Sequence, residues 1–174
     1  MSPPGRRGRQ SNGQSLGDAS SPVQLSSSVV GDRPVPTRAV PEVVARVGID
    51  LDPVDVTDAD DARWLRACVR VPEGALPVVT TTWALSPFPL EDRLRFLHRL
   101  REAAAGRAVA WVSVEGVGVA PTIPTLGDRR ASGHSIIGLA VFDRSAPRAQ
   151  AIGRCWSRGR LLAWLVDSWS EQRS

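Results

Sequence analysis

A short apolar segment that ends in aspartates is the first feature of this sequence that could do chemistry. Residues 43–51 read VVARVGIDL, with Asp50 at the end of the apolar run and Asp52 two positions later. A buried strand that ends in a carboxylate often binds the ribose of a nucleotide-type cofactor, because one carboxylate can accept hydrogen bonds from both hydroxyls. Asp50 and Asp52 are therefore the candidate cofactor-binding residues.

The same aspartates also have a simpler structural interpretation. Further aspartates follow between residues 55 and 61, and they are typical of a turn that caps the next helix. Their spacing lacks the glycine and glutamate of a calcium-binding EF-hand loop, and the cysteines and histidines are too dispersed for zinc. No metal site is predicted. A ribose site of this kind also needs a glycine-rich turn between a strand and a helix, and the sequence offers none.

Glu115 is the candidate catalytic residue. It ends the predicted strand 107–115, and ligands of open α/β sheets gather at the carboxyl ends of parallel strands. No serine lies in a nucleophile-elbow motif and neither cysteine lies in a paired-cysteine motif. His98 is predicted on a helix surface and His134 at the start of a strand, where an ordinary structural role is favoured over chemistry.

The elements that would position these residues alternate between strand and helix. Apolar, β-branched segments predict strands, and apolar residues at helical spacing predict helices. The predicted strands are 43–51, 76–85, 107–115, 134–143 and 149–157, the predicted helices are 58–69 and 89–106, and 159–169 fits either type. This order predicts an α/β fold, parallel at its front, with a C-terminal antiparallel strand pair.

The helix at 89–106 has the clearest pattern. Acidic residues occupy its first turn, and its apolar residues form one predicted core-facing stripe: Leu90, Leu94, Leu97, Leu100 and Ala104. Apolar segments also carry four tryptophans, most of which are predicted to be core or core-edge rings: Trp83, Trp111, Trp156 and Trp164.

Composition divides the chain into a tail and one domain. Residues 1–33 are dominated by Ser, Gly, Pro, Gln and Arg without an aromatic residue, so they are predicted to be disordered, and 34–174 to form the domain. No apolar run approaches the ~20 residues that span a bilayer, and no apolar segment follows the N-terminal arginines as a secretory signal would require. A cytoplasmic protein is expected.

The basic residues do not predict nucleic-acid binding. The chain carries 22 of them and a net charge of +4, and all are arginine. Arginine suits phosphate recognition, but GC-rich coding also accounts for it. Residues 1–40 carry five arginines and two aspartates, a net charge of +3, so most of the net positive charge lies in the tail and the few residues after it, and nucleic acid is an unlikely partner.

Four segments resemble an uncharacterised bacterial family, domain of unknown function 2332. They are VPEVVARVGIDLDPVDVTDADDARWLRACV (40–69), VPEGALPVVTTTWAL (71–85), GHSIIGLAVFD (133–143) and IGRCWSRGRLLAWL (152–165). The resemblance covers about residues 34–169. It implies a divergent class I methyltransferase-like three-layer sandwich, with S-adenosylmethionine as the family's cofactor and Asp50 at the ribose position.

Two departures from the family pattern bear on function. Residues 1–33 lack the family's upstream strand and glycine-containing turn, and Arg70 is followed at once by the VPEGAL segment, where the family continues with a longer helix and another strand. The chain therefore resembles a family C-terminal half with an internal deletion, a truncated doubly wound sheet with exposed edges.

Three functions remain open on this basis. The first is a catalytically incompetent methyltransferase-like remnant that holds no cofactor of its own. The second is a binding or regulatory module that completes its sheet with a partner chain. The third is an active methyltransferase-like transferase that holds its cofactor in a non-standard way.

Overall fold

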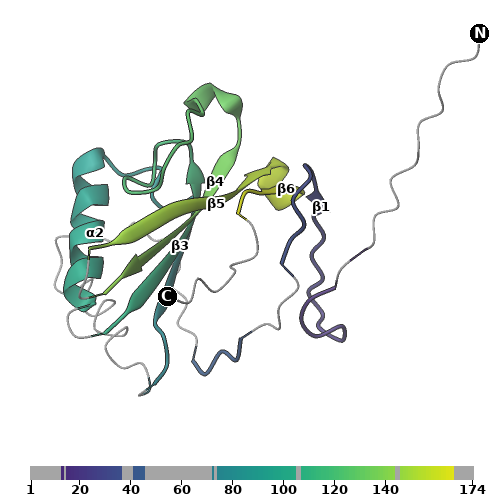
Figure 1. The fold of residues 1–174 in the computed structure, drawn as a ribbon, viewed down its shortest axis with the longest axis horizontal. Helices are drawn as coiled ribbons and strands as arrows, with labels where there is room; N and C mark the ends of the chain where they lie inside the picture. Colours follow the sequence, from purple (N-terminus) through teal and green to yellow (C-terminus); the bar gives the residue numbers. More distant parts are fainter. Residues whose placement is uncertain are drawn as a thin grey trace, which may run out of the picture.

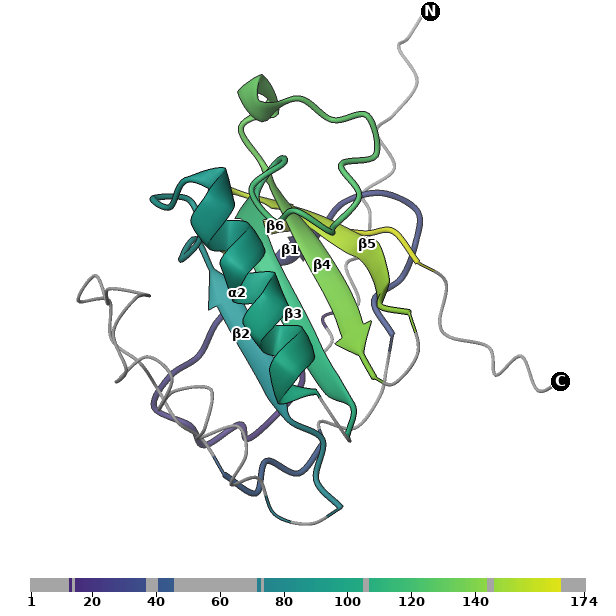
Figure 2. The ribbon, with the colours of Figure 1, turned by 90° about the vertical axis from the view of Figure 1, so that its left-hand side faces the viewer.

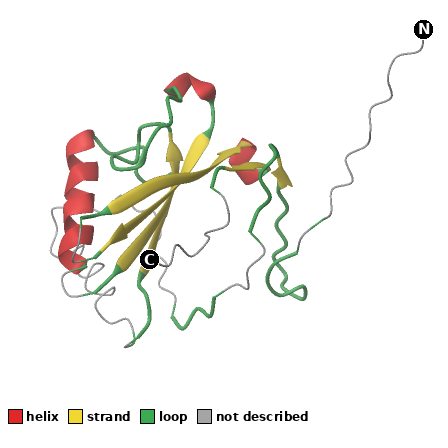
Figure 3. Cartoon of the chain, viewed as in Figure 1, coloured by secondary structure: helices red, strands yellow, loops and turns green. Residues whose placement is uncertain are grey.

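The computed structural model gives an α/β fold with one long helix and a six-stranded sheet (Figures 1 and 3). It describes residues 13, 15–36, 41–45, 72, 74–104, 107–143 and 146–166. The elements are β1 (Ser28–Val29), β2 (Val78–Thr82), α2 (Leu90–Ala103), β3 (Val109–Gly116), β4 (Ser135–Phe142), β5 (Arg148–Trp156) and β6 (Leu161–Trp164), with short 3-10 helices at Arg130–Ser132 and Ser157–Gly159. Most of the predicted strand 43–51 and all of the predicted helix 58–69 lie outside the described residues.

The sheet is mixed, with the strand order β1-β6-β5-β4-β3-β2. Strands β2 and β3 are parallel and are joined through α2, as the sequence predicts for the front of the sheet. The pairs β3–β4, β4–β5 and β5–β6 are antiparallel, which confirms the antiparallel pair β4–β5 and shows that the undecided segment 159–169 contains a strand. Strand β6 pairs parallel with β1 on its other side. The α/β class and the mixed sheet therefore agree with the sequence prediction.

Helix α2 covers one face of the sheet over β2 and β3 (Figure 2). Leu97 and Leu100 are buried against the sheet, and the ring of Phe96 meets the edge of Trp111 with ring centroids 5.4 Å apart. Trp111 is fully buried. Because apolar area removed from water is the main favourable term in folding, this helix–sheet contact forms the centre of the core.

The predicted apolar stripe of α2 is wrong at its first two members. Leu90 and Leu94 are 59% and 50% exposed. Arg93 takes the inward position in this part of the helix, because its guanidinium donates hydrogen bonds to the carbonyls of Phe88 and Ser86 in the preceding loop. The buried face therefore starts from residue 93, and the two leucines on either side of it turn toward solvent.

Strand β1 lies within the segment that the sequence predicts as a disordered tail. The Ser28 N–H donates to the Arg160 carbonyl and the Val30 N–H to the Leu162 carbonyl, each at 2.8 Å. A strand of two residues gives no periodic pattern in the sequence. Backbone hydrogen bonds to β6, and not burial of its side chains, hold it in place. The described residues 15–27 lie to one side of the sheet (Figure 1), and Leu25 among them is 93% exposed. None of the helices in the described part of the chain is long and apolar enough to cross a membrane.

Candidate functional site

The two predicted cofactor-binding aspartates, Asp50 and Asp52, lie outside the described residues. The structure does not place them relative to Glu115, so their ribose-binding role stays a prediction. Among the residues that the structure describes, no group of three or more His, Cys, Asp or Glu side chains could hold a metal ion. Glu115 is the predicted site residue whose surroundings are defined.

Glu115 lies near the C-terminal end of β3, beside the end of the parallel strand β2, as the sequence predicts. Because side chains alternate along a strand, Glu115 points to the same face as Trp111 and Ser113, which is the face covered by α2. It is only 1% exposed. A buried carboxyl group thus occupies the end of the sheet at which α/β proteins usually bind ligands.

The loop that follows β2 is hydrogen-bonded to Glu115. The carboxylate Oε1 accepts the backbone N–H of Ala84 at 3.1 Å and that of Leu85 at 3.2 Å. Arg93 holds the same loop from α2, since its Nε donates to the Phe88 carbonyl at 2.7 Å. The carboxylate and the guanidinium together fix the path of the chain between β2 and α2.

Further polar groups lie beside Glu115 on the same face of the sheet. Trp111 Nε1–H donates to Thr81 Oγ1 at 3.1 Å, which ties β3 to β2 through their side chains. Glu115 Oε2 and Ser113 Oγ are buried and have no hydrogen-bond partner among the described residues. An unpaired buried oxygen costs free energy. An ionised carboxylate is more costly to bury than a neutral carboxyl group, so the burial of Glu115 favours its protonated form.

Burial raises the pKa of the Glu115 carboxyl above its usual value. The Leu85 N–H, the Thr81 hydroxyl, the Ala84 N–H and the positive charge of Arg93 oppose this effect only in part. The folded protein therefore holds this proton to a higher pH than the unfolded chain does. The protonated Glu115 therefore contributes to the free energy of unfolding. This contribution is fully present below pH 4.5, the usual pKa of a glutamate, and is lost as the pH rises through the raised pKa of the folded protein.

Replacing Glu115 with Gln is expected to stabilise the protein at alkaline pH. The amide oxygen can still accept the Ala84 and Leu85 N–H groups, but no charge has to be buried. We expect a gain of about 1–3 kcal/mol in the free energy of unfolding at pH values above the raised pKa, from the usual cost of an uncompensated buried polar group. At acid pH, where wild-type Glu115 is protonated, the two proteins should be equally stable. Urea denaturation across this pH range measures the difference.

Glu91→Gln is the matched control for this comparison. Glu91 lies in the first turn of α2, and its side chain is 84% exposed and paired with Arg95. Its removal should leave the pH dependence nearly unchanged, because an exposed pair contributes little. Lower stability of Glu115→Gln at alkaline pH would instead show that the ionised carboxylate is required where it stands.

The outer side of β2 is a strand edge with no partner strand among the described residues (Figure 2). The Pro77 carbonyl accepts the Ala110 N–H at 2.9 Å, and the Trp83 N–H donates to the Val114 carbonyl at 3.0 Å. In a parallel ladder every second residue bonds to the neighbouring strand, so the odd-numbered residues of β2 bond to β3. The residues that direct their N–H and C=O groups outward are Val78, Thr80 and Thr82.

The side chains along this edge are uncharged and exposed. Val78, Thr80 and Thr82 all point away from α2 and are exposed, and Leu76 before the strand is 56% exposed. Trp83, one of the four tryptophans of which most are predicted to be core or core-edge rings, is 55% exposed. It leaves the strand with a φ of 56°, in the left-handed region. This turn of the backbone takes Trp83 out of the alternation of β2, which is why the apolar context of the sequence misplaced it.

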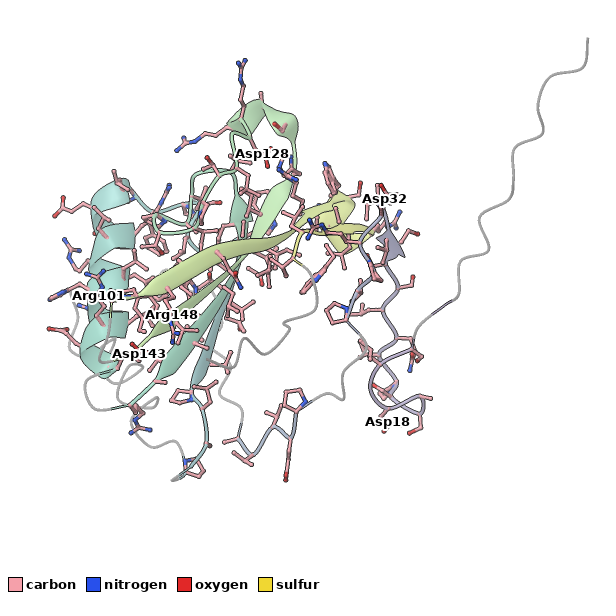
Figure 4. All side chains as sticks on the ribbon, in the orientation of Figure 1. Asp18, Asp32, Arg101, Asp128, Asp143 and Arg148 are labelled. Carbon is pink, nitrogen blue, oxygen red and sulfur yellow. The ribbon has the colours of Figure 1, made fainter. Side chains whose placement is uncertain are left out.

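A second polar cluster joins the loop between β3 and β4 to the sheet (Figure 4). Asp128 accepts hydrogen bonds from Arg154 Nε at 2.6 Å and from a terminal guanidinium nitrogen at 3.1 Å, and it lies 2.9 Å from His134 Nε2. The hydrogen bond from Arg154 is the main reason that the pKa of Asp128 lies below its usual range. The imidazole also packs against the Trp156 ring. All of its defined contacts give His134 a structural role.

The cysteine at residue 155 is a buried, free thiol. Burial raises the pKa of the Cys155 thiol, and a hydrogen bond with Ser135 opposes this only in part. A thiol of this kind is a poor nucleophile because the thiolate is the reactive form. Cys68 lies outside the described residues.

Comparison with known protein families gives a match to the family described as "Uncharacterized protein conserved in bacteria (DUF2332)". The match has two parts, residues 5–71 and residues 70–164, which meet where the sequence indicates an internal deletion. It begins within the predicted tail, whose low-complexity composition offered no motif to compare. No curated protein and no solved structure gave a significant match. Because the two parts together include most of the chain, this protein belongs to the DUF2332 family of uncharacterised bacterial proteins.

Proposed function

We propose that this chain is a non-catalytic, methyltransferase-like remnant that works as a binding module, in which a partner chain adds a strand to the outer edge of β2. The open edge of β2 is the observation that carries the proposal. An exposed strand presents a row of N–H and C=O groups that another strand can pair with, and strand addition is a common mode of protein recognition.

The two edges of the sheet differ in a way that favours β2 as the binding edge. At the other end of the sheet, β6 is already paired with β1. Proteins usually block strand edges with charged side chains, proline or a bulge, and β2 has none of these between Val78 and Thr82. Glu115 contributes indirectly, because its hydrogen bonds to Ala84 and Leu85 fix the loop that ends the strand.

The proposal includes the absence of S-adenosylmethionine binding by this chain. The family resemblance supplies the cofactor expectation, and the missing glycine-rich turn argues against it, since carboxylates such as Asp50 and Asp52 hold only the ribose part of such a ligand. The two-part family match supports an internal interruption near residue 70, and the family resemblance adds the doubly wound sandwich whose missing strands would leave this edge without a neighbour. Isothermal titration of the purified chain with S-adenosylmethionine should show no binding. Micromolar binding would instead favour an active transferase.

A proline substitution tests the edge without disturbing the sheet. Thr80 N–H points away from β3, so Thr80→Pro removes an outward donor while the bonds between β2 and β3 remain. A tagged chain isolated from its native host should carry a stoichiometric partner strand, and Thr80→Pro should lose it. In the complex, hydrogen exchange should slow at the outward amides of Val78, Thr80 and Thr82.

Val29→Pro is the matched control on the opposite edge. Ser28 and Val30 donate to β6, so the Val29 N–H points outward from β1 in the same way. This variant should keep the complex. If Thr80→Pro binds as wild type does, or if the outward amides of β2 exchange equally fast in the complex, the contact lies elsewhere and the proposal fails.

A further inference from the structure

Building on the proposed function, we infer that the strand added to β2 is β2 of a second copy of this chain. The two strands run antiparallel about a two-fold axis at Thr80. Val78 of each copy then lies opposite Thr82 of the other, and Thr80 lies opposite Thr80. The backbone pattern, the side chains of the edge and the closure of the assembly each support this partner.

The backbone pattern is self-complementary. The outward-facing residues Val78, Thr80 and Thr82 are evenly spaced, with Thr80 in the middle. In an antiparallel pair, two outward-facing residues that lie opposite each other exchange both of their hydrogen bonds. The register centred on Thr80 pairs all three outward residues of each copy. A shift by two residues in either direction leaves one of the three without a partner.

The side chains of the edge suit an identical edge better than a charged peptide. Val78, Thr80 and Thr82 carry no charge, so no opposite charge on a partner is selected. In the two-fold register a Thr–Thr pair lies at the centre with a Val–Thr pair on each side, and such pairs are favourable across strands. Trp83 of one copy follows Thr82 and therefore ends beside Pro77 and Leu76 of the other. At each end of the paired strands, the exposed Trp83 of one copy thereby makes an apolar contact with the exposed Leu76 of the other.

The pairing closes after two copies. A two-fold contact uses the same surface on both subunits. Once the pair forms, the outer edge of β2 is therefore occupied in both copies. The opposite edge of the sheet is the two-residue strand β1, which is too short to extend the sheet further. The expected product is a dimer with one continuous sheet, and not a fibre.

Charges placed at Thr80 test the two-fold register directly. Because Thr80 faces itself, Thr80→Lys and Thr80→Glu each put like charges opposite one another, which destabilises a cross-strand pair. We expect each variant alone to dimerise about tenfold more weakly than wild type or worse. An equal mixture of the two variants places Lys opposite Glu and should restore dimers of mixed composition. Sedimentation velocity from low micromolar to several hundred micromolar protein measures both effects.

A second set of variants tests the register away from the axis. Val78→Lys should weaken the dimer, and adding Thr82→Glu in the same chain should restore it, because residue 78 then lies opposite residue 82 of the other copy. Val29→Lys, on the opposite edge, is the control and should leave dimerisation unchanged. Circular dichroism confirms that each variant is folded, and all of these positions are exposed at the side chain.

The outcomes separate this inference from the proposed function. A wild-type chain that remains monomeric over the whole concentration range overturns the second copy as partner. The binding-module proposal would still stand if another chain protects the outward amides of β2. Dimerisation that is unaffected by Thr80→Lys shows that copies meet at another surface. If no chain protects these amides, both the inference and the proposed function fail.

Discussion

Trp111→Ala is expected to destabilise the fold by about 3–5 kcal/mol, the range for removing a large aromatic side chain from a core. Trp111 is fully buried, and its ring meets the Phe96 ring edge-on, with an angle of 72° between the planes. Its Nε1–H also donates to Thr81 on the open edge strand. The substitution therefore removes helix–sheet packing and a side-chain tie between β3 and β2 together.

Two further variants separate these contributions. Trp111→Phe keeps much of the apolar contact but leaves Thr81 without its donor, so we expect a smaller loss of about 1–3 kcal/mol. Trp83→Ala removes the same kind of ring from a site that is 55% exposed and should cost much less in the monomer. Urea denaturation at a fixed, low protein concentration measures the three free energies of unfolding. Equal costs for Trp83→Ala and Trp111→Ala would contradict the described core.

Gly138→Ala is expected to destabilise the protein by about 1–3 kcal/mol through overpacking. Gly138 lies in β4 directly under Ile123, a buried residue of the loop between β3 and β4. A Cβ at Gly138 would lie only 2.6–2.7 Å from three carbon atoms of the Ile123 side chain. Because Ile123 is buried, either its side chain or the loop that carries it must shift to accommodate the added methyl group.

Removing the opposing side chain should rescue this variant in part. Ile123→Ala alone loses buried apolar surface, but combining it with Gly138→Ala should cost less than the sum of the two single changes, because the clash no longer exists. Gly116→Ala is the matched control, since the nearest atom to its added Cβ would be Val119 Cγ2 at an ordinary 3.5 Å. Additive costs in the double variant, measured by thermal or urea unfolding, would show that Ile123 does not oppose Gly138.

The sequence predicted those parts of the fold whose residues are selected by local burial. Strands β2 to β5 and helix α2 are long enough to show apolar or helical periodicity, and all five were predicted within a few residues. The position of Glu115 at the end of a parallel strand followed from the same pattern. The α/β class and the antiparallel strand pair were predictable for this reason.

Features set by long-range contacts were not predictable. Strand β1 has two residues and exists through its backbone bonds to β6. The hydrogen-bond donors to Glu115 are backbone amides about thirty positions away in sequence. Every residue except proline has such an amide, so the residue types at positions 84 and 85 do not predict these bonds. The inward turn of Arg93 moved Leu90 and Leu94 to the surface, and the left-handed turn at Trp83 moved that ring out of the core.

The pairing of β1 with β6 also has a consequence for how the protein is made. Ser28 and Val29 leave the ribosome before any other strand of the sheet, and their partners Leu161 and Leu162 leave it last. Among the described elements, strands β2 to β5 pair with strands that are their neighbours in the chain and can assemble during synthesis, whereas contacts between distant parts of the sequence form slowly. Strand β1 therefore cannot pair until β6 has been synthesised, about 130 residues later, so this edge of the sheet depends on a contact between distant parts of the sequence.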